Sequence, residues 1–485
     1  MLLSKILSAI EYEGTIKTDG DICEIIYNSK YAKPDALFVC ITGFSADGHK
    51  YAQNAYENGV RSFVVEKDID LPDDANVFKV SNSRSALGVL SAEFYGHPDK
   101  QLKLIGITGT KGKTTTAHLV QKMLNASGIP CGIIGTVGAE FHGNKYPTNN
   151  TTPESFELYK LFRNMLDDGC KAVALEVSSI GLKQGRVDNL KFSVGVFTNL
   201  SPDHIGKNEH DTYNEYAFWK SKLFEFCDKA VFNCDDEAHV IMEKNCSCEK
   251  ISYGILGEYN ISASDIDVGK TGSNGLSFKC KVFDDVFDIK TNLKGYFNVY
   301  NALAAIAVSN TLGCDMNKAI GSLKDVQVSG RVEAVKIDAD YDVIIDYAHN
   351  GFSLESIIDT LKTDKVNRLI CVFGSVGGRT EERREEMGLV AGEMCDLCVV
   401  TSDNPNFEDP MSVIKDIVKA IEKVNGKYYV EPDRKKAIEY ALSVAESGDV
   451  VLLAGKGHEE YQLINGEKQP FSEKKIVLDY VRSNK

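Results

Sequence analysis

Short apolar runs and amphipathic segments alternate along this chain. The apolar runs predict strands, because strands buried on both faces read as near-continuous apolar segments. Through residue 330 the predicted strands are 37–41, 60–65, 102–107, 171–177 and 192–198. The predicted helices are 1–10, 52–58, 81–95, 114–125, 212–224 and 297–311. Strands that alternate with helices are typical of α/β proteins with mainly parallel sheets.

The C-terminal part of the chain repeats this alternation more regularly. Its predicted strands are 343–345, 369–373, 397–400 and 450–453, and its main predicted helices are 411–422 and 435–445. This pattern is typical of a doubly wound α/β sheet. Because 485 residues exceed what one hydrophobic core supports, several domains are expected. Breaks in the pattern place three domains at 1–98, 99–330 and 331–485, with a polar insertion at about 251–292.

A glycine-rich turn separates strand 102–107 from helix 114–125. It reads Gly106-Ile-Thr-Gly-Thr-Lys-Gly-Lys-Thr-Thr-Thr116. Glycines let backbone N–H groups approach an anion, the helix N-terminus favours negative charge, and Lys113 adds a full positive charge. The Thr114 hydroxyl is suited to Mg²⁺. Ile107 departs from the strict P-loop spacing, and an ordinary glycine-rich turn is the alternative. The order strand, turn, helix favours a phosphate site.

Composition narrows the classes of partner. A net charge of −15 argues against nucleic acid or an anionic membrane, since both require a basic surface. No apolar run reaches 18 residues, so membrane insertion is not expected. The 13 cysteines are odd in number and scattered, which predicts reduced thiols in a cytoplasmic protein. We interpret the CxxC spacing of Cys395 and Cys398 as core packing rather than as a metal site.

Polar residues follow the ends of two predicted strands, where α/β sheets bind their ligands. Glu176 ends one strand, and Asn199 and His204 follow the next. Each alone has an ordinary interpretation, as a capping carboxylate or a structural histidine. Together with the glycine-rich turn they favour metal-assisted phosphoryl transfer. A helix is also predicted to begin near Thr152, with that residue as N-cap and Pro153 in the first turn.

Six motifs occur together and in a fixed order along the chain. They are 109–114 (GTKGKT), 150–153 (NTTP), 176–179 (EVSS), 199–204 (NLSPDH), 346–349 (DYAH) and 455–459 (GKGHE). This ordered set resembles the Mur ligase family, and within it the enzymes that add the third peptide residue to UDP-N-acetylmuramoyl-L-alanyl-D-glutamate. The resemblance covers nearly the whole chain. It implies a uridine-nucleotide domain, a central ATPase domain and a C-terminal Rossmann-like domain.

The resemblance also implies the reaction and its cofactors. ATP would phosphorylate a carboxylate of the nucleotide-linked dipeptide, and the amine of a free diamino acid would attack the acyl phosphate. Lys113 would neutralise the γ-phosphate. Mg²⁺ would be held by Thr114, Glu176, His204 and Lys220, the last as an N6-carboxylysine. The implied ATP-binding residues are Gly109, Thr110, Lys111, Gly112, Lys113, Thr114, Thr115, Asn298, Arg331, Asp346 and His349.

The substrate residues implied by the resemblance fall into three groups. The uridine nucleotide would contact Ser29, Phe44 and Ser45. The dipeptide and sugar would contact Asn150, Thr151, Thr152, Ser178, Gln184 and Arg186. The incoming amino acid would contact Arg384, Asp403, Asn404, Pro405, Asn406, Gly455 and Glu459. We expect no nucleic-acid partner and a monomeric protein.

Residue 406 bears on which amino acid is added. Family members that use meso-diaminopimelate usually carry an arginine at this position of the Asp-Asn-Pro motif, where it pairs with the second carboxylate. Asn406 cannot neutralise that carboxylate, so L-lysine is preferred, with meso-diaminopimelate or ornithine as alternatives. Two other functions remain open: folylpolyglutamate synthesis by a related enzyme, and a nucleotide-dependent switch or scaffold that has lost ligase activity.

Overall fold

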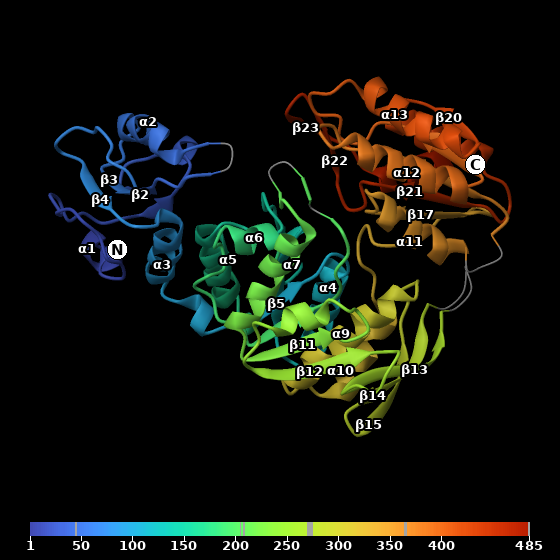
Figure 1. The fold of residues 1–485 in the computed structure, drawn as a ribbon, viewed down its shortest axis with the longest axis horizontal. Coiled ribbons are helices and arrows are strands. Elements are labelled where there is room, and N and C mark those ends of the chain that lie inside the picture. The colour runs from blue at the N-terminus through green and yellow to red at the C-terminus, as the bar shows by residue number, and fades with distance from the viewer. Residues whose placement is uncertain (44–45, 204, 207–208, 269–274, 363–365, 484–485) are drawn as a thin grey trace. The chain divides into compact units, whose positions relative to one another are not determined.

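The computed structural model describes residues 1–43, 46–203, 205–206, 209–268, 275–362 and 366–483. Its chain, drawn in Figure 1, divides into two compact units. The first unit comprises residues 1–263, 280–286 and 300–322, and the second comprises 264–279, 287–299 and 323–485. The domain limits predicted at 98 and 330 stay a prediction.

A four-stranded parallel sheet forms the N-terminal part of the first unit. Its strands lie in the order β1-β2-β3-β4. Alternate residues of β2 enter two separate cores, Leu37 and Val39 on one face and Phe38 on the other. The elements are α1 Leu3–Leu7, β1 Glu24–Ile26, η1 Ser29–Tyr31, β2 Ala36–Val39, η2 Gly48–Tyr51, α2 Ala52–Glu57, β3 Ser62–Val65, β4 Asn76–Lys79 and α3 Ser83–Tyr95. The helix predicted over residues 1–10 is therefore only five residues long.

A larger sheet forms the rest of the first unit. From β12 it runs β11-β10-β5-β9-β6-β7-β8, with parallel pairing as far as β6 and antiparallel pairing of β7 and β8. The glycine-rich turn thus follows a central strand, β5, between β10 and β9. The strands are β5 Lys103–Thr108, β6 Cys131–Gly135, β7 Gly138–Phe141, β8 Asn144–Tyr146, β9 Ala172–Glu176, β10 Val194–Phe197, β11 Lys229–Asn233 and β12 Glu249–Gly254.

The helices around this sheet confirm most of the predicted ones. They are η3 Pro98–Lys100, α4 Lys113–Ala126, α5 Ser155–Asp167, α6 Ser179–Lys183, α7 Tyr213–Ser221, η4 Lys222–Phe226, α8 His239–Glu243 and α10 Met316–Gly321. The predicted start of α5 is wrong. Its N-cap is Glu154, without a side-chain cap, because the Thr152 hydroxyl is instead buried against the end of β9.

The segment predicted as an insertion forms strands, as its short β-like runs indicate. They are β13 Ile261–Asp267, β14 Ser277–Val282 and β15 Asp285–Lys290. The alanine-rich helix α9 Phe297–Thr311 and the turn η5 Ser322–Asp325 follow them along the chain. The predicted helix at 297–311 is confirmed to the residue.

The second unit contains a doubly wound six-stranded sheet in the order β16-β17-β21-β18-β19-β20, antiparallel only at β16. A separate hairpin is formed by β22 and β23. The strands are β16 Glu333–Val335, β17 Asp342–Asp346, β18 Leu369–Phe373, β19 Leu397–Val400, β20 Tyr428–Val430, β21 Val450–Ala454, β22 Tyr461–Ile464 and β23 Glu467–Pro470. The helices are α11 Gly351–Lys362, α12 Glu381–Met394, α13 Pro410–Lys423, α14 Arg434–Val444 and α15 Glu473–Ser483.

Strand β18 shows why this sheet is covered on both faces. Cys371 and Phe373 enter a core shared with α11, α12 and α13, whereas Ile370 and Val372 enter a core shared with α14 and α15. Side chains of a strand alternate between faces, so a strand that is apolar at every position needs helices on both sides. Cys395 and Cys398 lie in the first of these cores, which agrees with their interpretation as packing residues.

All 13 cysteines are free thiols in this structure. Among the helices it describes, none combines the length and the apolar character needed to cross a membrane.

Candidate active site

The glycine-rich turn after β5 forms a tight cradle at the N-terminus of α4. Gly109 and Gly112 adopt φ angles of +149° and +84°. A Cβ atom at Gly109 would lie 1.9 Å from Thr198 Oγ1, and one at Gly112 would lie 2.3 Å from Asn301 Oδ1. Both positions therefore require glycine for steric as well as conformational reasons. The backbone of the turn can approach an anion closely only because these two side chains are absent.

Residues at the end of β10 hold this turn in place. The Asn199 side chain accepts a hydrogen bond from Lys111 N at 2.8 Å and donates one to Lys111 O at 3.1 Å. Thr198 Oγ1 donates to the same carbonyl at 2.7 Å. Asn199, predicted as a polar ligand, thus acts here as a clamp on the backbone of the turn. Lys111 Nζ also lies 3.3 Å from Asp203 Oδ2.

Two lysine side chains converge on one carbonyl of the turn. Lys113 Nζ donates to Gly109 O at 2.8 Å and to Thr110 O at 2.9 Å. Lys220 Nζ donates to Gly109 O at 2.8 Å. The structure therefore brings Lys220 to the turn that carries Gly109 and Lys113, although Lys220 is distant from both in the sequence. The Lys113 ammonium places a positive charge beside the turn.

Lys220 lies inside the protein rather than on its surface. Only 2% of the residue is exposed, and Nζ lies 4.6 Å from the centre of the Tyr216 ring. Burial, followed by the charges of Lys113 and Lys111, lowers the pKa of Lys220 well below its usual value, although Asp203 opposes this. A neutral amine is nucleophilic, whereas an ammonium is not. This burial shows that Lys220 is not an ordinary surface lysine.

Helix α7, which carries Lys220, is fixed at its N-terminus by Thr212. The Thr212 hydroxyl accepts a hydrogen bond from Glu215 N at 3.1 Å. We expect Thr212→Ala to destabilise the first unit by about 1 kcal/mol, because the capping acceptor is lost, and Thr212→Ser to change little. Trp219, the only tryptophan in the chain, lies on α7, so its fluorescence during urea unfolding measures this effect locally. Equal unfolding of the two variants would contradict the capping role.

Glu176 ends β9 as predicted and is almost completely buried. Its carboxylate accepts hydrogen bonds from Thr136 N and Thr136 Oγ1, both at 3.1 Å. Gly135 makes room for it, because a Cβ atom there would lie 2.1 Å from Glu176 Oε1. A carboxylate at the end of a central strand, held by a threonine, offers the hard oxygen ligands that Mg²⁺ prefers. Thr114 is also predicted to bind this metal. It is buried in the first turn of α4.

Four of the residues predicted to contact the dipeptide and sugar form one hydrogen-bonded group. Thr152 Oγ1 donates to Glu176 O at 2.9 Å and accepts from Ser178 N at 2.9 Å. Arg186 donates from Nη1 to Thr152 O at 2.7 Å and from Nη2 to Gln184 Oε1. Of the other predicted members, Thr151 pairs with Thr136 through its hydroxyl at 3.1 Å, and Asn150 precedes it in the same turn.

A cavity of about 380 Å³ opens near Ser29 in the first unit. Ser29 begins η1, and its neighbours Asn28 and Tyr31 line the cavity. Aromatic rings of Tyr27, Tyr146 and Phe156 line it as well. Aromatic faces and an amide side chain are suited to stacking on a planar base and reading its edge. Phe44, Ser45 and His204, also predicted site residues, lie outside the described residues.

The second unit places four of the predicted amino-acid contacts around a buried lysine. Lys456 Nζ donates to Asn404 Oδ1 and Glu459 Oε2, both at 3.0 Å, and lies 3.7 Å from Asp403 Oδ1. Burial raises the pKa of Asp403, against the opposing charges of Arg434 and Lys456. Gly455 has to be glycine, since a Cβ atom would lie 2.6 Å from Asp403 Oδ2. Pro405 continues the segment that carries Asn404.

The side chains of Asn406 and Arg384 are engaged within the second unit. Asn406 has a φ of +53°, and its Oδ1 accepts a hydrogen bond from Gly466 N in the β22–β23 turn at 2.9 Å. Arg384 is 4% exposed and donates to Glu408 at 2.7 Å and to Asp416 at 3.0 Å. Residue 406 thus has a structural role in holding the hairpin, which weakens its value as a signal of amino-acid selectivity.

The remaining predicted nucleotide contacts also lie in the second unit. Asp346 accepts hydrogen bonds from Val332 N and Ala348 N, both at 2.8 Å. The guanidinium carbon of Arg331 lies 4.8 Å from the centre of the Tyr347 ring, and His349 Nδ1 donates to Tyr347 O at 2.7 Å. Asp346 ends β17 and His349 follows that strand, whereas Arg331 precedes β16. Asn298 donates from Nδ2 to Lys294 O.

Sequence reasoning missed several residues that position the site. Thr136 holds Glu176, Thr198 holds the turn, and Lys456 organises the amino-acid contacts. Of these three, Lys456 could have been predicted from the sequence, because it lies in the motif 455–459 between the predicted contacts Gly455 and Glu459. Thr136 and Thr198 act through contacts formed by sheet pairing, which no local pattern indicates.

The whole chain is similar to proteins of one family. The family descriptions "Mur ligase family, catalytic domain", "Mur ligase middle domain" and "Mur ligase, glutamate ligase domain" match residues 21–95, 107–309 and 330–457. A UDP-N-acetylmuramoyl-L-alanyl-D-glutamate–2,6-diaminopimelate ligase of Caldanaerobacter subterraneus subsp. tengcongensis is 40% identical over 480 residues, covering 99% of this chain and 98% of that protein. One of Clostridium perfringens is 37% identical over 488 residues, covering 99% of each chain. A solved structure of a ligase with the same description has a TM-score of 0.68 at 26% identity, covering 100% of this chain and 99% of the other.

Proposed function

Because the chain belongs to the Mur ligase family, and within it to the MurE type, we propose that it adds the third peptide residue to UDP-N-acetylmuramoyl-L-alanyl-D-glutamate at the expense of ATP. The reaction would serve peptidoglycan precursor synthesis. The three-domain α/β fold with mainly parallel sheets is that of the family. The observation that carries the proposal is the convergence of Lys113 and Lys220 on the Gly109 carbonyl of the glycine-rich turn.

The proposed chemistry activates a carboxylate before an amine attacks it. An oxide ion is a poor leaving group, so direct amide formation is slow. Transfer of the ATP γ-phosphoryl group to the D-glutamate carboxylate would give an acyl phosphate, and attack by the amine would release inorganic phosphate. Phosphoryl transfer depends mainly on positioning and on neutralisation of charge. Lys113 supplies that charge, and the N–H groups of the turn orient the phosphates.

Mg²⁺ fits the oxygen atoms at this site. It would bind the Glu176 carboxylate and the Thr114 hydroxyl and neutralise the ATP phosphates. The amine of Lys220 is no ligand for so hard a cation, but its carboxylated form would offer anionic oxygens. The neutral amine favoured by burial is the form that reacts with CO₂. These features support the N6-carboxylysine implied by the sequence, with His204 as a further proposed ligand.

The substrate groups follow the placement of the predicted residues. We assign the uridine end of the nucleotide to the cavity beside Ser29, because its aromatic lining is suited to a base. The dipeptide and sugar are assigned to the group of Thr152, Ser178 and Arg186, next to Glu176. The incoming diamino acid is assigned to the cluster around Lys456. Asn298, Arg331, Asp346 and His349 remain proposed contacts of ATP.

For the amino acid we propose diaminopimelate instead of the L-lysine that the sequence favoured. The named relatives act on 2,6-diaminopimelate, and they span nearly the whole chain. The lysine preference depended on Asn406, whose side chain instead serves the hairpin turn at Gly466. A residue with a structural task can vary without changing the substrate.

An amino-acid panel tests this proposal. With ATP and the nucleotide-dipeptide present, we expect phosphate release with diaminopimelate to exceed that with L-lysine or ornithine by at least about 10-fold in kcat/KM, since a hydrogen bond to a charged group contributes about 1.5–3 kcal/mol. Asn406→Arg should leave this order of preference among the amino acids unchanged, because the Asn406 side chain bonds to the hairpin turn at Gly466. Asn425→Arg is a matched control, since Asn425 also has a positive φ, +56°, at an exposed position. A wild-type preference for lysine would contradict the assignment.

The same assay separates the proposed ligase from the two other functions. A MurE-type ligase releases phosphate only when both the nucleotide-dipeptide and the amino acid are present. Turnover with a folate and glutamate instead would indicate folylpolyglutamate synthesis. ATP hydrolysis indifferent to both acceptors, or none at all, would indicate a switch or scaffold protein.

A further inference from the structure

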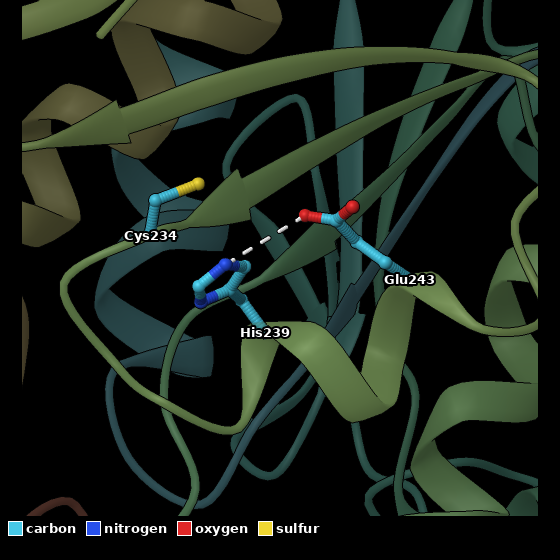
Figure 2. A group of neighbouring side chains, drawn as sticks. All are labelled: Cys234, His239 and Glu243. Carbon is cyan, nitrogen blue, oxygen red and sulfur yellow. Dashed lines mark ion pairs between the residues drawn. The ribbon is translucent and has the colours of Figure 1, made fainter. Parts of the chain in front are cut away.

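A cysteine, a histidine and a glutamate meet at the turn between β11 and α8. Cys234 directly follows β11, and His239 and Glu243 lie one helical turn apart on α8. One ligand atom from each residue lies within 4.8 Å of the other two. Figure 2 shows the thiol, the imidazole and the carboxylate facing a common space. None of the three residues takes part in the site described above.

The imidazole of His239 is oriented as a metal ligand. Its Nδ1 lies 2.9 Å from the carbonyl oxygen of Asp236, which can only accept, so Nδ1 carries a proton. In the neutral ring, Nε2 therefore presents its lone pair. That lone pair faces Glu243 Oε1 at 3.9 Å, which is too long for a hydrogen bond. A backbone carbonyl on Nδ1 that directs Nε2 toward a cation is the usual arrangement around metal-bound histidine.

The other two groups are also poised around this space. Lys250 Nζ donates a hydrogen bond to Glu243 Oε2 at 2.9 Å, so the other carboxylate oxygen, Oε1, faces the imidazole. The Cys234 thiol makes a long contact of 3.6 Å from Sγ to Phe232 O. Burial, the Glu243 carboxylate and Asp235 raise the pKa of this thiol to about 11. A bound cation would reverse that effect, because it attracts the thiolate.

Two aspartates stabilise the turn that carries these residues through hydrogen bonds to neighbouring groups. Asp235 accepts hydrogen bonds from the hydroxyls of Tyr259 at 2.7 Å and Tyr300 at 3.0 Å. Asp236 accepts from Leu200 N at 2.9 Å and from Ala238 N at 3.0 Å. These carboxylates fix the turn rather than compete as ligands. The spacing of the three candidate ligands is therefore set by the fold.

We propose that Cys234, His239 and Glu243 form a binding site for a thiophilic divalent cation, with Zn²⁺ as the best match. Thiolate, imidazole and carboxylate are all zinc ligands, and three of them with a water complete a tetrahedron. A hard cation such as Mg²⁺ would not select a thiolate. Ligand atoms around tetrahedral zinc are about 3.5 Å apart, so binding draws the three groups slightly closer. Cys234 binds as the thiolate and releases its proton to solvent. This site is independent of the proposed ligase function.

Cobalt and zinc binding to the full chain test the site. Metal-free protein is titrated with Co²⁺ in excess Mg²⁺, and the expected signal is one equivalent with a sulfur-to-cobalt charge-transfer band and visible tetrahedral bands. Zn²⁺ should displace the cobalt and bleach both. Cys234→Ser should abolish the charge-transfer band, while His239→Ala and Glu243→Gln should each weaken Zn²⁺ binding by at least about 10-fold.

A nearby cysteine serves as the matched control. Cys246 also lies in the first unit, where its Sγ is 3.5 Å from Cys248 Sγ rather than in the cluster. Cys246→Ser should leave the band and the affinity unchanged. The proposal is overturned if wild-type protein binds no cobalt or zinc in the micromolar range, or if Cys246→Ser removes the band and Cys234→Ser does not. Far-ultraviolet circular dichroism of each variant distinguishes a lost ligand from a lost fold, and Glu243→Gln preserves side-chain shape if Cys234→Ser does not fold.

Discussion

Lys113→Ala is expected to reduce kcat/KM for ATP-dependent phosphate release by about 10³- to 10⁵-fold, the range seen when a cation that stabilises a transferring phosphoryl group is removed. Lys113 Nζ contacts the Gly109 and Thr110 carbonyls of the turn and lies at the N-terminus of α4. The assay is phosphate release that depends on both the nucleotide-dipeptide and the amino acid.

A lysine at the other end of β5 provides the control for this prediction. Lys103 is exposed and begins the strand whose end leads into the turn. Lys103→Ala should retain activity within about 2-fold, because surface substitutions away from special features change little. If Lys113→Ala retains a tenth or more of the wild-type activity, the glycine-rich turn does not hold the transferred phosphate.

Lys220→Ala is expected to lower kcat by about 10²- to 10³-fold, as removal of one preorganised stabilising group does. We further expect acetate or formate to restore part of the activity. The alanine variant leaves a space beside the Gly109 carbonyl, and a small carboxylate could supply there the anionic oxygens that a carboxylated lysine would offer. Steady-state rates at increasing concentrations of the small acid measure the rescue.

Lys222 is the matched control for Lys220. It lies two residues later, is 29% exposed at its side chain, and pairs with Glu225 at 2.8 Å. Lys222→Ala should keep wild-type activity and show no response to acetate. Loss of activity in Lys220→Ala without rescue by any small acid would argue for a role of the unmodified amine, and intact-protein mass after gentle isolation would then show no added CO₂.

Much of the fold follows from local pattern. The apolar runs at 369–373 and 450–453 are uninterrupted because both faces of the second-unit sheet are covered, and such runs identify buried strands directly. Helix α9 begins and ends at the predicted residues. The N-terminal helix was overestimated: Leu3, Ile6 and Leu7 are fully buried within it, whereas Met1 and Ile10 pack against the same core from outside the helix. The hydrophobic pattern indicates which residues can be buried. Tertiary contacts determine where a helix or strand begins and ends.

Site residues that lie within a sequence motif could be predicted. Residues that reach the site through contacts between distant parts of the chain could not. Lys113 and Glu176 were selected from their positions beside β5 and β9. Thr152 was interpreted as a helix cap, because its sequence context fits one, whereas its hydroxyl bonds to the end of β9, 24 residues away. The environment of Lys220 could not be predicted either. Its burial depends on α7 packing over the turn, which no local sequence indicates.

The pair of amines on the Gly109 carbonyl has a thermodynamic consequence. Burial and the neighbouring charge of Lys113 favour the neutral amine of Lys220, so Lys113 carries the positive charge that a bound polyphosphate would neutralise. A ligand that binds only the folded protein stabilises it by RT ln(1 + [L]/Kd), which is about 2.7 kcal/mol at a hundred times Kd. The Tm of the protein would therefore rise with the concentration of the bound nucleotide. If the turn binds the phosphates as proposed, the stability of the folded chain would depend on the concentration of its nucleotide.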